Sequence, residues 1–102
     1  MLYQQGDVLF RSIEALPEKV KEIKQNGPIV VAQGETTGHA HKILDDVKAF
    51  LDEKDNMFLE IESPVTVVHE EHKPIELPEG IYMVDKVREY DHFQEESRRV
   101  RD

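Results

Sequence analysis

The chain has 102 residues, 38% of them hydrophobic and 34% charged, which is enough for one domain with a single modest core. Its formal net charge of -9, with no large cluster of Lys and Arg, disfavours binding to an extended nucleic acid. The absence of cysteine excludes disulfide bonds, thiolate metal sites and cysteine nucleophiles.

The first part of the chain predicts one strand followed by one helix. Residues Asp7–Ile13 are rich in β-forming side chains. From Leu16 onward apolar residues recur at positions i, i+4 and i+7, and Pro17 stands where a first helical residue is expected. We therefore expect one short amphipathic helix near residues 17–25, packed over one end of the domain.

Beyond this point, short apolar runs predict strands that are separated by turns. The expected strands are Pro28–Ala32, Gly38–Leu44, Val47–Asp52, Met57–Glu62, Val65–His69 and Ile81–Tyr90. Since no β-α-β alternation is present, the chain predicts an all-β fold, a small antiparallel barrel or sandwich. Residues 1–102 are expected to form this single β-rich domain, with a charged C-terminal tail from about residue 92.

A pair of histidines follows a turn rich in glycine and threonine. His39 and His41 come at the end of the segment Gly34–His41, inside the expected strand Gly38–Leu44. Side chains at positions i and i+2 of a strand leave the same face of the sheet. Both imidazoles are therefore expected to point in one direction, as two ligands of one metal ion must.

A second pair, His69 and His72, comes at the end of a later apolar run. On a straight strand two residues three apart point to opposite faces, and His69 alone would then be the better third ligand. Both can reach a common site if the chain turns between them. Lys73-Pro74 favours such a break, because proline cannot extend a central strand.

Neutral imidazole is a good ligand for several transition metals. We predict that folding brings the two pairs together as a site for a divalent transition metal such as Zn, Ni, Mn or Fe. The expected ligands are His39, His41, His69 and His72. The spacing does not choose among these metals.

A metal at this position would act as a Lewis acid in a small hydrolase. Carboxylates near the histidines would accept a proton from water, and the candidates are Glu35, Glu70 and Glu71. The candidate substrate-binding residues are Thr36 and Thr37, for an oxyanion, and Arg88 and Tyr90, for a phosphate or carboxylate. Structural interpretations stand beside these: the turn links two strands, and the arginine packs beside the tyrosine ring.

Two other functions fit the same histidines. They could form a metal-free polar network in a non-enzymatic protein that self-associates, because a small β domain has strand edges to cover. They could also act without metal as acid and base in a phosphodiesterase or ribonuclease. The acidic surface makes long RNA a poor substrate for the second scheme.

The expected partners are a small-molecule ligand or a short nucleotide, and a second copy of the chain. No membrane partner is expected, because no stretch has the length and apolarity of a membrane span and the N-terminus lacks the pattern of a secretion signal. The resulting expectation is a cytoplasmic protein that is a homo-oligomer.

The His-x-His pair, followed later by the turn Pro78-Glu79-Gly80, resembles the small β-barrels of the cupin class. That resemblance implies a cupin-like outline for the fold. In cupins a Glu follows shortly after the His-x-His and another His follows the Pro-x-Gly turn. Here Lys42–Leu44 and Ile81–Met83 stand in those places, so the cupin ligand assignment carries over to His39 and His41 alone.

A second resemblance covers most of the chain. The segments Gly34–His41 and His69–Tyr82, followed by Arg88-Glu89-Tyr90, are similar to a group of small, uncharacterised bacterial and phage-associated proteins. The resemblance implies that the two histidine clusters belong to one family pattern. It implies no function.

Overall fold

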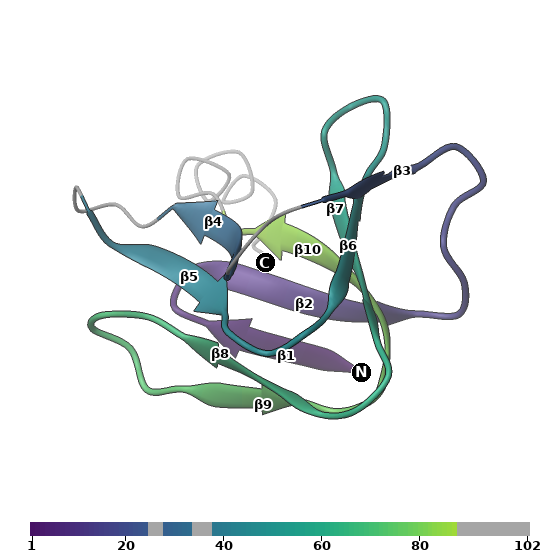
Figure 1. The fold of residues 1–102 in the computed structure, drawn as a ribbon. Helices are drawn as coiled ribbons and strands as arrows, with labels where there is room; N and C mark the ends of the chain where they lie inside the picture. The colour runs from purple at the N-terminus through teal and green to yellow at the C-terminus, as the bar shows by residue number, and fades with distance from the viewer. Residues whose placement is uncertain (25–27, 34–37, 88–102) are drawn as a thin grey trace, which may run out of the picture.

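The computed structural model describes residues 1–24, 28–33 and 38–87, and this part of the chain is all-β. Two antiparallel sheets lie against each other in a compact globule (Figure 1). The larger sheet has the order β1 (Leu2–Gln5), β2 (Val8–Ile13), β10 (Gly80–Lys86), β7 (Met57–Ile61), β6 (Lys48–Leu51) and β3 (Lys21–Ile23). The smaller has the order β4 (Ile29–Gln33), β5 (Ala40–Ile43), β8 (Val65–Val68) and β9 (Ile75–Leu77). The predicted all-β antiparallel fold is confirmed.

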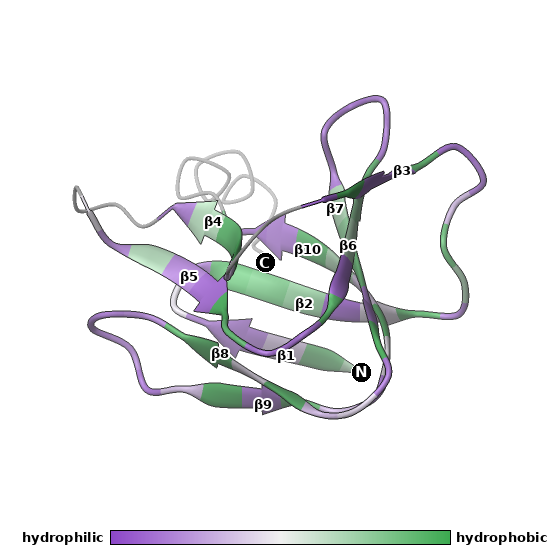
Figure 2. Cartoon of the chain, viewed as in Figure 1, coloured by the Kyte–Doolittle hydropathy of each residue, from purple (hydrophilic) through white to green (hydrophobic). Residues whose placement is uncertain are grey.

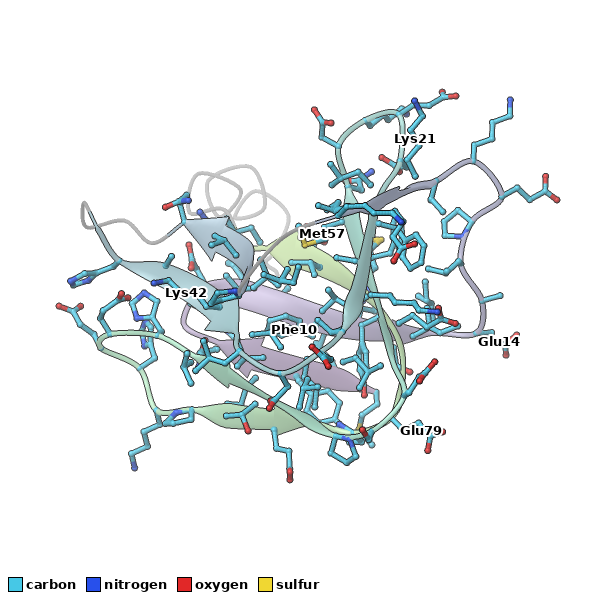
Figure 3. The ribbon with its side chains drawn as sticks, viewed as in Figure 1. Phe10, Glu14, Lys21, Lys42, Met57 and Glu79 are labelled. Atoms are coloured by element: carbon cyan, nitrogen blue, oxygen red, sulfur yellow. The ribbon has the colours of Figure 1, made fainter. Side chains whose placement is uncertain are left out.

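One hydrophobic core holds the two sheets together. It takes Phe10 from β2 and Leu59 from β7 in the larger sheet, and Ile43 from β5 and Val67 from β8 in the smaller, and all four are fully buried. Figure 3 shows Phe10 between the two layers. Figure 2 shows how hydrophobic and hydrophilic residues are distributed along the strands. On β8, buried positions alternate with more exposed ones, so that Val65 and Val67 face the core. This burial fixes the register of each strand.

The predicted helix near residues 17–25 is wrong. No helix occurs in the described residues, and Lys21–Ile23 form the edge strand β3, paired antiparallel with β6. The apolar spacing that suggested a helix serves another purpose, since Ile23 packs against the core. A helix of two turns is marginal by itself, whereas β6 offers a ladder of backbone hydrogen bonds. Residue 25 lies outside the described residues.

The other expected strands are present with small shifts, and two further strands were not expected. β1 and β9 are short, four and three residues long. The expected strand Ile81–Tyr90 corresponds to β10, which ends at Lys86. Residues 88–102, which include the expected tail, lie outside the described part of the chain. In that described part no helix has the length and apolar character needed to cross a bilayer.

Two chain reversals and the start of β5 lie at one end of the two sheets. The β1–β2 turn, the start of β5 and the β8–β9 loop are all on the left in Figure 1. The β6–β7 hairpin and β3 extend at the opposite side. Because β1 belongs to the larger sheet and β5, β8 and β9 to the smaller, this end is where loops from both layers meet.

The β6–β7 hairpin is closed by one carboxylate. Asp52 Oδ1 accepts hydrogen bonds from the backbone N–H groups of Lys54 (2.8 Å) and Asn56 (2.9 Å), and Oδ2 accepts one from the Asn56 side chain (3.0 Å). The hydrogen bonds from Asn56 are the main reason that the pKa of Asp52 is lowered. The charged form of Asp52 therefore stabilises the fold.

Core packing predicts the effect of one large-to-small change. Leu59→Ala removes a side chain that is fully buried between the sheets, so the free energy of unfolding should fall by about 3 kcal/mol. Leu44→Ala makes the same change at a side chain that is 62% exposed, and should alter stability by less than about 0.5 kcal/mol. Urea unfolding of both variants measures the difference, and equal losses would contradict the two-sheet core.

The Asp52 carboxylate predicts a pH dependence. A folded-state pKa below the ordinary value of 3.8 contributes stability above pH 3.8, and that contribution is lost as the pH falls through the folded value. Asp52→Asn should therefore melt at a lower temperature than the natural protein near pH 7 and at nearly the same temperature in strong acid. The exposed Asp46→Asn is the control, with no such convergence. A melting difference for Asp52→Asn that is independent of pH would rule out the charged hydrogen bonds.

Candidate metal centre

Four imidazoles from the two histidine pairs lie together at the end where the loops meet. The ring centroids of His41 and His69 are 4.3 Å apart, and those of His69 and His72 are 4.6 Å apart. His39 lies 5.7 Å from His69, with the rings nearly perpendicular. The rings of His41 and His72 are stacked at 5.9 Å. Segments far apart in the sequence thus place all four rings in one cluster.

His69 and His72 point to one side because the strand β8 ends before them. β8 stops at Val68 and the chain bends over residues 70–72, which carries His72 back toward His69. The backbone N–H of Glu71 donates to His69 Nδ1 at 3.0 Å, within this bend. The chain therefore makes the turn that is needed for His69 and His72 to reach a common site.

Glu70 joins the two histidine segments. Its Oε1 accepts a hydrogen bond of 2.9 Å from the backbone N–H of Ala40, the residue between His39 and His41. Its Oε2 lies 4.0 Å from Lys42 Nζ. The hydrogen bond from Ala40 is the largest cause that lowers the pKa of Glu70, so the carboxylate stays ionised and is a weaker base.

Three side chains present donor atoms close enough to share an ion. One ligand atom each from His39, His69 and Glu70 lies within 4.8 Å of the other two. Two nitrogen ligands of a tetrahedral zinc ion are about 3.4 Å apart, so small side-chain rotations would bring these atoms to bonding positions. In the described part of the chain this is the one group of His, Asp and Glu that meets the spacing. His41 and His72 lie beside the group and not in it.

His39 Nδ1 is an unsatisfied polar atom. It is buried and has no hydrogen-bond partner among the described residues, and the nearest carboxylate, Glu71 Oε2, is 3.8 Å away. A buried ring nitrogen without a partner lowers stability by about 1–3 kcal/mol. An ion bound at this nitrogen would satisfy it, so His39 suits a metal ligand by its chemistry as well as by its position.

His41 is the most buried imidazole, with 1% of its surface exposed. Its Nδ1 is 2.8 Å from Gln5 Oε1, and its Nε2 is 3.8 Å from Asp7 Oδ1. Burial is the largest cause that lowers the pKa of His41, followed by the neighbouring His69. The ring therefore favours the neutral state, which is the form that binds metals.

The β1–β2 turn forms the floor of the cluster. Gly6 has a φ of +61°, and a Cβ at this position would lie 2.6 Å from His72 Nε2. Only glycine therefore lets the His72 ring lie over the turn. The same turn carries Gln5 and Asp7, the two residues that face His41.

The β1–β2 turn was not predicted from the sequence. The first strand was placed at Asp7–Ile13, so the strand Leu2–Gln5 and its pairing with Val8–Ile13 were overlooked. A Gly-Asp pair between two β-forming runs is a typical two-residue hairpin signal. It would have revealed the turn, although not its contacts with residues more than thirty positions away.

Comparison with known proteins is informative at the family level. Residues 4–87 match the model of a family described as a domain of unknown function (DUF8820). The chain belongs to this family. No match was found among curated proteins or among solved structures. The matched region contains the β1–β2 turn and both histidine pairs, so the contacts of the histidine cluster lie within the family domain.

Of the remaining predicted site residues, only Glu71 lies in the described part of the chain. Glu71 is exposed at the rim of the cluster, near His39. The other candidates lie outside the described residues, and their roles stay predictions: Glu35, Thr36, Thr37, Arg88 and Tyr90.

The close approach at Gly6 predicts a matched pair of variants. Gly6→Ala and Gly38→Ala both place a side chain at positive φ, which should lower stability by about 1 kcal/mol. Gly38 has nothing within 4 Å of the added Cβ, whereas Gly6 meets the His72 ring. Only Gly6→Ala should shift the NMR signals of the His72 ring, because the exposed ring must move away from the added Cβ. Identical behaviour of the two variants would show that His72 does not lie on the turn.

Proposed function

We propose that this protein binds a divalent transition-metal ion through His39, His69 and Glu70. The observation that carries the proposal is the group of three donor atoms, one each from His39, His69 and Glu70, which lie within 4.8 Å of one another. The buried Nδ1 of His39, which has no hydrogen-bond partner among the described residues, supports the proposal. The side chains come from two loops, and the hydrogen bond from Ala40 to Glu70 holds those loops together.

The chemistry of the donors narrows the class of metal. Two imidazole nitrogens and one carboxylate oxygen suit zinc, nickel, manganese or iron in the divalent state. Without thiolates, the set does not favour the softest ions. The neighbouring His41, which favours the neutral state, adds no positive charge that would oppose a cation.

The number and exposure of the donors favour a catalytic role over a structural one. Structural zinc ions are enclosed by four protein ligands, whereas catalytic ions have three and keep one position for water or substrate. Here the group has three donors, and Glu70 is 38% exposed, so small molecules can approach it. A metal at this position would supply Lewis-acid chemistry for hydrolysis of a phosphate or carboxylic ester.

Within this scheme the two loop carboxylates have different roles. Glu70 is a ligand, because its charge is maintained by the Ala40 hydrogen bond. Glu71 is 64% exposed and lies at the rim, where its carboxylate would accept a proton from an attacking water. The buried His41 would exclude bulk water from the inner side of the cluster.

Metal binding is tested first, on untagged protein stripped with a chelator. Calorimetric titration with Zn²⁺ should show binding, and saturation should raise the melting temperature because the ion binds only the folded chain. His39→Ala, His69→Ala and Glu70→Gln should each weaken binding at least about tenfold. Glu79→Gln is the control, since Figure 3 shows Glu79 well away from Lys42, whose Nζ lies 4.0 Å from Glu70 Oε2. No binding of Zn, Ni, Mn or Fe by the natural protein would refute the proposal.

Hydrolysis is tested separately, with the metal-loaded protein and generic phosphodiester and carboxylic ester substrates. Turnover should disappear with chelator, return on adding the ion, and fall strongly in Glu71→Gln while metal affinity is retained. Tight binding with no turnover on either class of ester would contradict the catalytic step and leave a metal-binding domain.

A further inference from the structure

The Gln5 side chain has one possible orientation. It is 3% exposed, and its amide nitrogen donates to two backbone carbonyls, Val67 O at 3.0 Å and Lys73 O at 2.9 Å. If the amide were turned over, its oxygen would face those two acceptors with no hydrogen between them. The two carbonyls therefore fix Gln5 Oε1 toward His41.

The fixed amide in turn determines the tautomer of His41. Gln5 Oε1 can only accept, so the 2.8 Å contact requires the proton on His41 Nδ1. In the neutral ring this leaves a lone pair on Nε2. The same arrangement, with one ring nitrogen donating to an oxygen and the other free, is how proteins orient histidine ligands of metals.

The free nitrogen faces a carboxylate. His41 Nε2 lies 3.8 Å from Asp7 Oδ1, and both atoms are acceptors, so neither can satisfy the other. Two donor atoms at this separation would fit on one divalent cation after small movements. Lys86 Nζ lies 3.7 Å from the other oxygen, Asp7 Oδ2, and is 44% exposed, so it can move away.

We propose that His41 Nε2 and Asp7 Oδ1 form a second, weaker binding position for a divalent cation, beside the group of His39, His69 and Glu70. The inference deepens the proposed metal-binding function and rests on it. Two protein donors leave several positions to water, which makes this site the weaker of the two. In the protein without metal, Lys86 supplies the positive charge next to Asp7, so it competes with the incoming cation.

The role of Gln5 is tested without metal. Long-range ¹H–¹⁵N spectra of the metal-free protein should show His41 protonated on Nδ1 and unprotonated on Nε2. Gln5→Met, which keeps the length of the side chain and removes the amide, should lose this preference. Gln4→Met makes the same change at the neighbouring exposed position and should keep it. A natural His41 that is protonated on Nε2 would overturn the inference whatever metals the protein binds.

The second site is tested by titration with Zn²⁺. The natural protein should bind two ions, and the second should shift the His41 Nε2 resonance. Asp7→Asn should weaken the second step at least about tenfold and leave the first unchanged. Lys86→Gln should tighten the second step, because it removes the competing charge. A merely structural ion pair between Lys86 and Asp7 predicts no such tightening.

The outcomes separate this inference from the proposed function. The second site is overturned, and the first kept, if the protein binds one ion that His39→Ala abolishes. In that case the His41 Nε2 resonance does not shift, and neither Asp7→Asn nor Lys86→Gln changes binding. No bound ion, with every histidine resonance unmoved, overturns both. Two ions whose second step responds oppositely to Asp7→Asn and Lys86→Gln establish the second site.

Discussion

The buried amide of Gln5 is the constraint on which the histidine end of the molecule depends. It lies on β1 in the larger sheet and bonds to Val67 and His41 in the smaller sheet and to Lys73 in the loop between β8 and β9. A buried amide must satisfy its donors and acceptor, or the fold loses about 1–3 kcal/mol for each group left unpaired. Hydrophobic contacts hold the two layers together without directional preference, whereas these three hydrogen bonds fix how the loops meet.

The fold class could be predicted from the sequence, but the short strands could not. Val65–Val68 shows its alternation locally, because one of its faces is buried. Met57–Ile61 is recognisable as an apolar run, although the neighbours Phe58 and Leu59 are both buried. Lys21–Ile23 could not be recognised, because its strand state comes from pairing with Phe50 and its neighbours on β6. The helical spacing of nearby apolar residues was a weaker influence than that tertiary pairing. Ile75–Leu77 is too short to show any period.

The candidate site was predictable in its histidines and not in its surroundings. His39 and His41 were identifiable from strand spacing, and His69 and His72 from the break before Pro74. Gln5 was not identifiable, because its partners lie 36 to 68 positions away and a single glutamine carries no local signal of burial. Long-range hydrogen bonds of this kind become visible only when the sheet order is known.

The site combines a fixed part with an adjustable part. His41 is buried, held at one nitrogen by Gln5, and set in a strand between two neighbours, so its position follows from the core. His39, His69 and Glu70 precede or follow strands and are partly exposed, and their donor atoms lie within 4.8 Å of one another. Loop residues can move into the positions of metal ligands at small cost in free energy, because few buried contacts oppose the movement. A bound ion would therefore draw the loop ligands inward toward His41. The β1–β2 turn, which holds His41 through Gln5, would then determine where that ion binds.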